Sequence, residues 1–493
     1  MSSFLSSDQQ SKFSSLDPST KEVLGDFYID KTPEVSQVVK DAKVASLWWQ
    51  EIDFYKRKKY LNSWAKLLSS RSKELAQLIS KENGKLFDDA LLEVILSIEH
   101  LSWAAKHAEQ ILSHTKVSSG WLMFGSKSFI HYDPLGTIGV IGPWNYPFFT
   151  PMGSISYALA AGNTVVFKPS EYVPMVAQWM KNSFDEIVPN PHILQVINGF
   201  GPTGEALCRS GVDKISFTGS EATSKKVMKV CAENLIPVLI ESGGKDALLV
   251  AHDADVDKAA DATAWGAYSN GGQTCIGIEV AYVVEEVYDS FVDKLSTIVK
   301  NLHSGTQVSS SYGPMTIDRQ CEIVRSQVQD AIEKNATIIC GTVTYKDNYI
   351  DPILLTNVSS EAQILQEETL GPVLVVKQVK GIDEAIELVN NSPYALSAAI
   401  FSKRHGLEIA HQIKVGMVSV NSILTFAAVP SLPFGGRKSS GFGRIHGEQG
   451  LKEFSYAKSI IDKRFSMPIP LTSFRRPKKA MSWIANLSRI IHR

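Results

Sequence analysis

Short apolar runs alternate with segments of helical periodicity through the middle of the chain, and this alternation constrains the fold more than any other feature. The runs expected to be strands are Thr164–Phe167, Leu194–Ile197, Lys214–Phe217, Pro237–Ile240 and Ala247–Val250. Strands that alternate with helices at this spacing form a parallel sheet with helices on both faces. The pattern therefore predicts an α/β fold.

A second alternating block lies between about Val280 and Ser422. Its apolar runs are Ala281–Val284, Thr337–Cys340, Val373–Val376, Ala398–Phe401 and Val418–Val420. The chain has 493 residues, enough for two or three domains. Two α/β blocks are therefore expected, with no internal repeat.

The N-terminal third reads mainly as helix. Helical patterns run from Thr32 to about Ser80 and from Leu86 to about Ser113, with a helix stop expected at Glu82–Lys85. Strands are expected at Phe124–Tyr132 and Thr137–Ile141. Residues 1–15 are rich in serine and are predicted to be mobile.

Composition excludes several functions. The net charge is −1, whereas general affinity for nucleic acids needs an excess of basic residues. An odd number of cysteines without CxxC spacing fits a reducing compartment and neither a disulfide framework nor a zinc site. The first residues do not form a signal peptide, and no run of eighteen apolar residues occurs. We therefore expect a cytoplasmic protein without a metal.

One cysteine follows a polar, glycine-rich stretch, Ser269-Asn270-Gly271-Gly272-Gln273-Thr274-Cys275. These residues suit a turn, on which a thiolate can reach a cleft and act as a nucleophile. The alternative is a small buried hydrophobic residue, which is the commoner role of cysteine.

Three motifs follow predicted strands in the first block and suggest nucleotide binding. Asn198–Gly204 has GxGxxG spacing and reads as a cofactor contact or a tight turn. Phe217–Ser220 opens a helical segment, so it can hold a pyrophosphate or simply cap the helix through Ser220. Lys168–Glu171 can bond ribose hydroxyls, or be a solvated turn.

Two further segments suggest catalysis. Pro143–Pro147 is a loop stiffened by two prolines, and its asparagine amide suits an oxyanion donor. Glu241–Lys245 places a carboxylate beside apolar strand residues, where its charged form is disfavoured, which suits a general base. The alternatives are a buried turn and a surface carboxylate.

With these segments in this order, together with Glu367–Pro372 and Pro433–Gly441, the chain resembles the NAD(P)-dependent aldehyde dehydrogenase superfamily over about Leu16–Tyr456. The resemblance implies Cys275 as the nucleophile and Glu241 as the general base. It also implies an oxyanion hole made of the Asn145 side chain and the Cys275 N–H.

The resemblance further implies a nicotinamide cofactor. Lys168 and Glu171 are expected at the adenosine ribose, Gly219 and Ser220 at the pyrophosphate, and Glu368 at the nicotinamide ribose. The full set of expected cofactor contacts is Trp144, Lys168, Ser170, Glu171, Gly201, Phe217, Gly219, Ser220, Gly243, Glu368 and Leu370.

The chain departs from the family pattern at three positions, none of which is a reacting group. Ser224 replaces a glycine, so its helix is expected to approach the neighbouring strand less closely. Leu370 replaces a phenylalanine near the nicotinamide, and Ser242 stands where a leucine is common.

The implied fold is a Rossmann-like NAD-binding domain plus an α/β catalytic domain, with a small β oligomerisation extension. The expected NAD-binding domain comprises 1–118 and 139–246, and the catalytic domain 247–454. An oligomerisation hairpin at 119–138 and a strand at 455–474 imply a homodimer or homotetramer.

The implied reaction is oxidation of a small-molecule aldehyde to its acid through a cysteine thioester. Glu241 favours water over coenzyme A as the acyl acceptor, and Glu171 favours NAD over NADP because its charge repels a 2′-phosphate. Residues 148–154 lack positive charge and Ile276 follows the nucleophile, so an aliphatic or aromatic aldehyde is expected. The alternatives are a cofactor-independent esterase using Cys275 and a non-catalytic binding protein of the same fold.

The C-terminal segment 475–493 is basic and amphipathic. Met481, Trp483, Ile484, Leu487 and Ile491 recur at helical spacing after Arg475–Lys479. Such a segment can lie on an anionic membrane, which would make the protein peripheral to one. The alternative is a helix docked on a neighbouring subunit or domain.

Overall fold

The computed structural model describes residues 11–342, 347–465 and 473–493. Its contacts divide the chain into two compact units. The first is drawn from Met1–Ile111 and Pro134–Phe454, so far as these are described, and the second from Leu112–Asp133 and Ser455–Arg493. The two units are described separately below, and the domain boundaries drawn from the sequence stay predictions.

The first unit contains two sheets, and the first of them confirms the earlier block of predicted strands. Its strands are β5 (Thr137–Ile141), β6 (Thr164–Lys168), β7 (Leu194–Val196), β8 (Lys214–Thr218), β9 (Val238–Glu241) and β19 (Gly441–Phe442). Their order is β19-β9-β8-β5-β6-β7, and every pairing from β9 to β7 is parallel. From β5 the chain builds outward first through β6 and β7 and then, on the other side, through β8 and β9. The strand order therefore reverses at β5, and such a reversal opens a crevice at the carboxyl ends of the strands.

The second sheet has the order β12-β13-β14-β11-β10-β16-β17, and only β12 runs antiparallel to its neighbour. The strands are β10 (Asp246–Val250), β11 (Ile278–Val284), β12 (Thr337–Cys340), β13 (Ile353–Thr356), β14 (Val373–Val379), β16 (Ser397–Phe401) and β17 (Met417–Val420). The sequence reading missed β13. It also grouped β10 with the first block, which is wrong, because β10 pairs with β11 and β16. Parallel neighbours need a crossover of a dozen or more residues, and only residues 242–245 separate β9 from β10.

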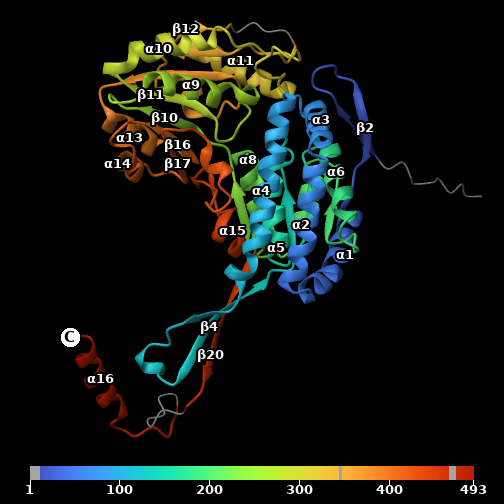
Figure 1. Ribbon diagram of the computed structural model, residues 1–493, viewed down its shortest axis with the longest axis vertical. Coiled ribbons are helices and arrows are strands. Elements are labelled where there is room, and N and C mark those ends of the chain that lie inside the picture. The colour runs from blue at the N-terminus through green and yellow to red at the C-terminus, as the bar shows by residue number, and fades with distance from the viewer. Residues whose placement is uncertain (1–10, 343–346, 466–472) are drawn as a thin grey trace, which may run out of the picture. The chain divides into compact units, whose positions relative to one another are not determined.

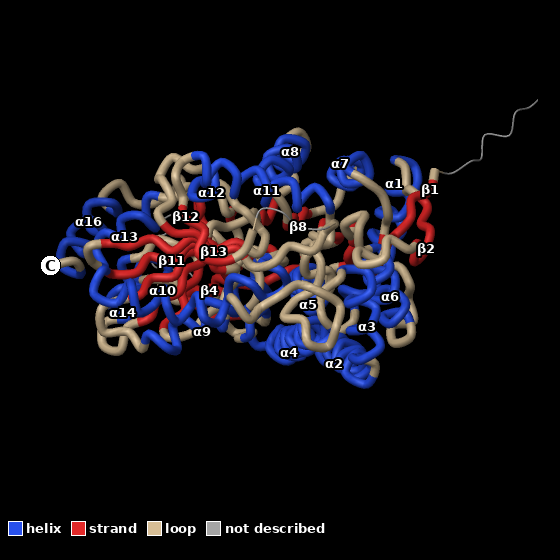
Figure 2. The backbone as a smooth tube through the Cα atoms, turned by 90° about the horizontal axis from the view of Figure 1, so that it is seen from above, coloured by secondary structure: helices blue, strands red, loops and turns tan. Residues whose placement is uncertain are grey.

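Helices cover both faces of the first sheet (Figure 2). On one face lie α1 (Thr32–Glu51), α7 (Gly201–Arg209) and α8 (Glu221–Ala232), whose apolar side chains share a buried core with the strands. The opposite face carries α2 (Phe54–Ser70), α3 (Ser72–Asn83), α4 (Phe87–Leu112), α5 (Phe149–Ala160) and α6 (Pro174–Asp185). The second sheet is covered by α9 (Val256–Tyr268) and α10 (Glu285–Val299) on one face, and by α11 (Asp318–Glu333), α13 (Ile382–Asn391) and α14 (Gly406–Gln412) on the other.

The long helical pattern from Thr32 to Ser80 is divided into three helices. The first ends at Glu51, and Asp53 begins the second as its N-cap, because its side chain accepts a hydrogen bond from the Lys56 N–H at 2.7 Å. The third helix ends at Gly84, which has a φ of +92°, so the predicted helix stop is confirmed.

Regular structure begins closer to the N-terminus than the sequence predicted. A hairpin of β1 (Lys12–Leu16) and β2 (Val23–Tyr28) includes residues 12–15, for which the prediction of mobility is wrong. Ser15 Oγ donates a hydrogen bond to the buried Glu82 carboxylate at 2.6 Å, which ties the hairpin to α3. Residues 1–10, on which the rest of that prediction falls, lie outside the described residues.

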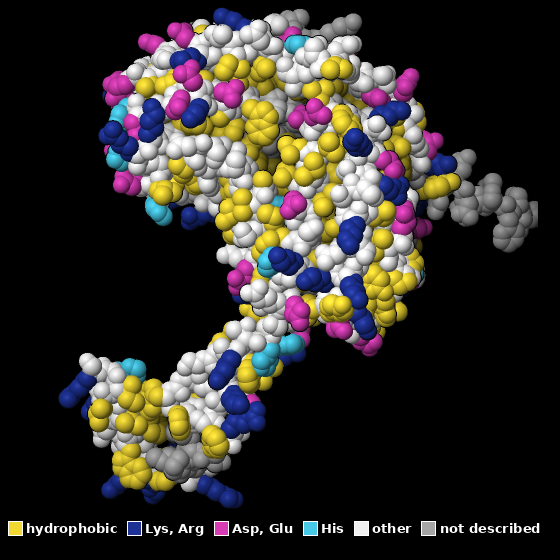
Figure 3. Space-filling model, viewed as in Figure 1, with side chains coloured by type: hydrophobic (Ala, Val, Ile, Leu, Met, Phe, Trp, Pro, Cys, Tyr) yellow, Lys and Arg dark blue, Asp and Glu magenta, His cyan; other side chains and the backbone are white. Residues whose placement is uncertain are grey.

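The second unit is a three-stranded sheet followed by a helix (Figure 1). Its strand order is β20-β4-β3, with β3 at Thr115–Val117, β4 at Ser126–Pro134 and β20 at Ser455–Lys463. The sequence placed a strand at 455–474, of which 466–472 lie outside the described residues. Helix α16 (Ala480–Ile491) follows, and both hydrophobic and basic side chains are exposed on this unit (Figure 3). Over the described ranges, no helix combines the length and hydrophobicity needed to cross a membrane.

The remaining short elements complete the described chain. They are the 3-10 turns η1 (Trp121–Met123), η2 (Ser269–Gly272) and η3 (Thr425–Ala428), the helices α12 (Gln363–Gln366) and α15 (Gly447–Glu453), and the strands β15 (Tyr394–Ala395) and β18 (Arg437–Lys438).

Candidate active site

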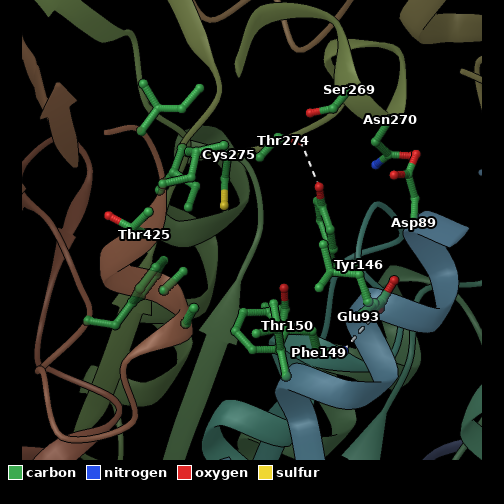
Figure 4. A pocket seen from close by; sticks show the side chains of 18 of the residues that line it. Asp89, Glu93, Tyr146, Phe149, Thr150, Ser269, Asn270, Thr274, Cys275 and Thr425 are labelled. Atoms are coloured by element: carbon green, nitrogen blue, oxygen red, sulfur yellow. Dashed lines mark hydrogen bonds between the residues drawn. The ribbon is translucent and has the colours of Figure 1, made fainter. Parts of the chain in front are cut away.

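A cavity of about 260 Å³ lies in the first unit, and Cys275 is part of its wall (Figure 4). Most of the lining is apolar. The apolar side chains come from α4, α5, α9, the residue after Cys275, the loop around η3 and residues 434–445: Leu92, Leu96, Phe149, Trp265, Ile276, Ile423, Leu424, Ala427, Ala428, Phe434 and Ile445. Glu241, Thr274 and His446 also face this space. A thiol and a carboxylate therefore meet in a pocket suited to an apolar molecule.

The turn that carries Cys275 requires its two glycines. Asn270, Gly271 and Gly272 have φ values of +53°, +63° and +69°. A Cβ atom on Gly272 would lie 2.1 Å from the Gly371 carbonyl oxygen, so only glycine fits this close approach. The Gln273 side chain then locks the turn by accepting from the Thr316 N–H and donating to the Asn270 carbonyl, both at 2.9 Å.

Cys275 is partly exposed, whereas the other four cysteines are buried. The structure thus does not support the reading of Cys275 as a small core residue. The alternative fits Cys208, Cys231, Cys321 and Cys340 instead.

The Cys275 thiol lies next to the Glu241 carboxylate. Sγ donates a hydrogen bond to Oε1 at 3.5 Å, and Thr218 Oγ1 donates to Oε2 at 3.3 Å. Glu241 is only 3% exposed, so the reading of a surface carboxylate is wrong. Burial raises the pKa of Glu241 to about 7, and the two donated hydrogen bonds oppose this rise.

The pKa of Cys275 is also raised, well above its ordinary value. Burial is the main cause, and the nearby Glu241, Glu368 and Asp246 carboxylates add to it. In the resting site the sulfur is therefore a thiol, and Glu241 is placed to take its proton.

The Asn145 amide is fixed against the nucleophile turn. The Asn145 Nδ2 donates to the Gln273 carbonyl oxygen at 2.9 Å, and the backbone carbonyl oxygen of Asn145 accepts from Asn270 Nδ2 at 3.3 Å. A carboxamide nitrogen carries two hydrogens, so one is left to donate to an oxyanion. The structure thus brings together all three residues predicted for catalysis.

A buried ion pair, which sequence reasoning missed, supports the Asn145 loop. Lys85 Nζ lies 2.6 Å from Glu93 Oε2, and both side chains are fully buried. Lys85 also donates to the Asn145 carbonyl at 2.9 Å, and Glu93 accepts from the Phe148 and Phe149 N–H groups at 2.8 and 3.0 Å. The partners are distant from this loop in sequence, and only the Asn83-Gly84 turn before Lys85 marked the region.

Tyr146 joins the same loop to the nucleophile turn. Its hydroxyl bonds Thr274 Oγ1 at 2.9 Å, and its ring centroid lies 3.8 Å from Lys85 Nζ (Figure 4). Burial raises the pKa of the Tyr146 phenol, so the hydroxyl stays protonated and holds Thr274 by its hydrogen bond.

His446 is a second residue that the sequence reading missed. Its ring is buried in the cavity wall, its φ is +64°, and it lies 3.9 Å from the His100 ring between centroids. Neither ring nitrogen of His446 has a hydrogen-bond partner among the described residues. Burial and the neighbouring His100 lower its pKa well below the ordinary value, so the ring is neutral.

The predicted cofactor residues gather at the carboxyl ends of neighbouring parallel strands. Trp144 follows β5, Lys168 ends β6, Ser220 follows β8 and Gly243 follows β9. These strands flank the point at which the strand order reverses, where open α/β sheets bind nucleotides. The sheet thus brings together motifs that are separate in sequence.

The Lys168–Glu171 turn is more buried than a solvated turn would be. Lys168 is 5% exposed and Ser170 is also buried, while Glu171 is half-buried. Lys168 Nζ donates to the Pro169 carbonyl at 2.8 Å, and Ser170 Oγ donates to Glu171 at 3.4 Å. Burial lowers the pKa of Lys168, and the Glu171 charge opposes this.

The loop after β8 is tied to the predicted base. The Gly219 N–H donates to the Glu241 carbonyl at 3.0 Å, and Ser220 Oγ accepts from the Thr223 N–H as the N-cap of α8. The Phe217 ring belongs to the apolar core below this loop, 2.7 Å from the position of a Cβ on Gly219. Phe217 therefore supports Gly219 from within the core.

Two departures from the family pattern contact each other. Ser224 Oγ and Ser242 Oγ lie 2.7 Å apart, and Ser224 Oγ also donates to the Ser220 carbonyl at 3.1 Å. Both serines are only 3% exposed. The hydrogen bond links α8 to the residue after β9, so the serine that replaces a glycine connects helix and strand here.

Glu368 and Gly243 face each other directly. A Cβ atom on Gly243 would lie 2.0 Å from Glu368 Oε2, and the Gly244 N–H donates to Glu368 Oε1 at 3.1 Å. Burial raises the pKa of Glu368 to about 8, and the charge of Glu279 adds to the rise. Any side chain at position 243 would collide with the Glu368 carboxylate, so glycine is required for this close approach.

A second buried pair, also missed from the sequence, holds the Glu368 loop. Glu279 accepts from the Thr369 N–H at 3.0 Å and the Leu370 N–H at 2.8 Å, and it is ion-paired with Lys245. Leu370 has a φ of +47°, so this pair maintains an uncommon backbone conformation.

The GxGxxG segment forms a tight turn before α7. Gly199 has a φ of +147°, and Gly201 is the first residue of the helix. A Cβ on Gly204 would lie 3.5 Å from Lys168 Cδ, whereas one on Gly201 would have no atom within 4 Å. The prediction of a tight turn therefore describes the backbone, and a cofactor contact at Gly201 stays a prediction.

Over the described ranges, no three His, Cys, Asp or Glu side chains cluster as metal ligands would.

Comparisons with known proteins agree with this geometry. Residues 4–460 match the model of the aldehyde dehydrogenase family. A 4,4'-diapolycopene aldehyde oxidase of Methylomonas is 35% identical over 90% of this chain and 85% of its own length. Aldehyde dehydrogenase 1 of Tanacetum cinerariifolium is 34% identical over 94% of each chain.

Solved structures resemble the whole fold. An aldehyde dehydrogenase from Brucella melitensis biovar abortus matches 92% of this chain and 95% of its own, with a TM-score of 0.88 and 26% identity. An NADP-dependent glyceraldehyde-3-phosphate dehydrogenase from Bacillus halodurans, complexed with NADP, matches 92% of this chain and 96% of its own, with a TM-score of 0.87 and 29% identity. The chain therefore belongs to the aldehyde dehydrogenase family and has the fold of that family.

Proposed function

We propose that the protein oxidises an apolar aliphatic or aromatic aldehyde to the carboxylic acid with NAD, using Cys275 as the nucleophile. The observation that carries this proposal is the 3.5 Å contact between Cys275 Sγ and Glu241 Oε1 at the wall of the apolar cavity. A thiol beside a buried carboxylate has the base it needs to become a nucleophile.

The first step is addition of the thiol to the aldehyde. Glu241 takes the thiol proton, the sulfur bonds to the carbonyl carbon, and the carbonyl π electrons move to oxygen. The second hydrogen of Asn145 Nδ2 and the Cys275 N–H stabilise that oxyanion. The product of this step is a thiohemiacetal on Cys275.

NAD, when bound, is the hydride acceptor that converts this adduct to a thioester. Lys168 and Glu171 would hold its adenosine ribose, Ser220 and the α8 N-terminus its pyrophosphate, and Glu368 its nicotinamide ribose. Because Gly243 has no side chain, the Glu368 carboxylate can lie against its backbone.

Hydrolysis completes the reaction. Glu241 first releases the proton taken from the thiol to solvent. It then takes a proton from a water molecule while the oxygen of that water attacks the thioester carbon. The carbon–sulfur bond breaks, Cys275 leaves as a thiolate, and the carboxylic acid forms. A pKa of about 7 suits Glu241 to both proton transfers near neutral pH.

The wall of the cavity supports an apolar substrate. Its lining residues include no lysine or arginine to pair with an anionic aldehyde, and aromatic and aliphatic side chains dominate. Neutral His446 offers hydrogen bonding at one place on this wall.

The choice of NAD over NADP rests on Glu171. Its carboxylate follows β6, at the position expected for the adenosine ribose, where it would repel a 2′-phosphate. Two solved relatives, an E. coli enzyme and the glyceraldehyde-3-phosphate dehydrogenase of Bacillus halodurans, are NADP-dependent, which is a property of those proteins.

We extend the proposal to assembly and compartment. The second unit ends its sheet in β20, an edge strand with exposed Tyr456, Ile460 and Ile461, which suits pairing with another copy in a homodimer or homotetramer. The five cysteines, all among the described residues, form no disulfide, which suits a reducing compartment such as the cytoplasm.

A spectrophotometric assay tests the function. The protein is mixed with NAD and linear aldehydes of increasing chain length, and NADH absorbance is followed. We expect kcat/KM to rise with the chain length of the aldehyde and to vanish in Cys275→Ala. The control is Cys340→Ala, which changes a cysteine in the core of the second sheet and should stay active. Absence of NADH together with ester cleavage that requires Cys275 would favour the esterase, and absence of both activities would favour a binding protein.

A further inference from the structure

Helix α16 carries a continuous apolar stripe along one side. At about 100° per residue, its apolar side chains fall within an arc of about 120°. The stripe consists of Ala480, Trp483, Ile484, Leu487, Ile490 and Ile491. Arg489 projects from the opposite side, and Met481 lies outside the stripe, unlike in the pattern read from the sequence.

Most of this stripe is exposed. Trp483 is 53%, Leu487 48%, Ile490 69% and Ile491 47% exposed, and Ala480 is the buried residue of the helix. Each of these four large side chains thus leaves about half or more of its surface uncovered in the described part of the chain. An exposed apolar face of this kind needs an occupant.

The segment around the stripe is strongly basic. Residues 473–493 contain six lysines and arginines and no aspartate or glutamate: Arg475, Arg476, Lys478, Lys479, Arg489 and Arg493. The whole chain has a net charge of −1, so the rest of it has a net charge of −1 − 6 = −7. Positive charge is therefore concentrated in this tail.

We propose that residues 473–493 bind the surface of an anionic phospholipid bilayer, with α16 lying in the plane of the interface. The apolar stripe would enter the boundary between headgroups and acyl chains, and Trp483 is a residue type favoured there. The cations before and after the helix, Arg475, Arg476, Lys478, Lys479 and Arg493, would face lipid phosphates and carboxylates, which supply negative charge without needing individual partners. The helix has twelve residues, about 18 Å, and so lies on a bilayer rather than crossing it.

Charge favours lipid over a second copy of this chain as the occupant. A protein surface that buried this segment would have to supply carboxylates matched to six cations around one short helix. An anionic bilayer meets the same demand by its composition alone. The proposal goes beyond the proposed function, and it would place the enzyme where apolar aldehydes concentrate.

Vesicle co-sedimentation of the full-length protein tests the proposal. We expect at least about tenfold stronger partitioning onto vesicles that contain phosphatidylserine than onto phosphatidylcholine alone, and weaker binding at high salt. Equal binding to both vesicles, or to neither, would overturn the proposal.

Two single substitutions of equal charge form a matched pair. Leu487→Glu places a carboxylate in the stripe, whereas Ser482→Glu places one on the polar side of the same helix. We expect Leu487→Glu to lose most binding and Ser482→Glu to keep most of it. Equal loss in both would mean that charge alone acts, which would overturn the role of the stripe.

Two further measurements separate this proposal from its alternatives. Both variants should oxidise a short soluble aldehyde at the wild-type rate, which would show that the substitutions leave the catalytic unit unchanged. Vesicle binding is measured without an aldehyde, so it tests this proposal even if the proposed activity is not found. The molar mass in solution, measured by light scattering, should be unchanged in Leu487→Glu. If Leu487→Glu has a lower molar mass than the wild type, and the wild type does not bind vesicles, the stripe is instead a contact between copies of the chain.

Discussion

The Cys275 thiol donates its hydrogen bond directly to the Glu241 carboxylate, with 3.5 Å between Sγ and Oε1. Neither group is set up for reaction by itself, because burial keeps the thiol protonated and raises the pKa of the carboxylate. Together they form an acid–base pair within one cavity, so activity should depend on the protonation of Glu241.

The pH dependence should report Glu241. Because the carboxylate must be ionised to act as a base and its pKa is about 7, kcat/KM should rise with pH and level off above about 7. Glu241→Gln should lower kcat about 10²- to 10⁴-fold and remove this inflection. An unchanged profile in Glu241→Gln would assign the base elsewhere.

Gly272→Ala should inactivate the enzyme while the fold is kept. The added Cβ would collide with the Gly371 carbonyl oxygen at 2.1 Å, at a φ of +69°, and so displace the turn that carries Cys275. Gly381→Ala is the control, since a Cβ there meets no atom within 4 Å. Turnover and circular dichroism would be compared, and full activity in Gly272→Ala would contradict the need for this turn.

Lys85→Met should destabilise the protein by about 3–5 kcal/mol, because it leaves Glu93 buried without its ion partner. Urea unfolding measures the change. The double variant Lys85→Met/Glu93→Gln should recover part of the loss, since the unpaired charge is gone. If the loss of unfolding free energy in the double variant equals the sum of the losses in Lys85→Met and Glu93→Gln, the two residues act independently.

Glu171→Gln should increase the use of NADP. Removing the carboxylate at the carboxyl end of β6 removes repulsion of a 2′-phosphate, and we expect the ratio of kcat/KM for NADP to that for NAD to rise about tenfold, or about 1.4 kcal/mol. Glu186→Gln, an exposed carboxylate paired with Arg71, is the control. If wild-type protein already uses NADP as well as NAD, the argument from Glu171 is refuted.

The sequence pattern predicted most strands of the two large sheets, though not β13, and it predicted residues that meet at the candidate site. The period of apolar residues marked β5, β6 and β8 within a few residues, because a strand buried on both faces is recognisable from its own side chains. Cys275, Glu241 and Asn145 were found because each sits in a short motif with an uncommon composition.

What the sequence determined by itself was the α/β class and the order of most strand and helix segments, and it also named the side chains that we propose to react. The tertiary structure decided which sheet β10 joins, and it decided the pairings Lys85–Glu93, Lys245–Glu279 and Ser224–Ser242. Local periodicity depends on neighbouring residues and is therefore written in the sequence. Which buried charge or hydroxyl meets which partner depends on how the elements pack, because a buried polar group is stable only where packing brings its partner within bonding distance.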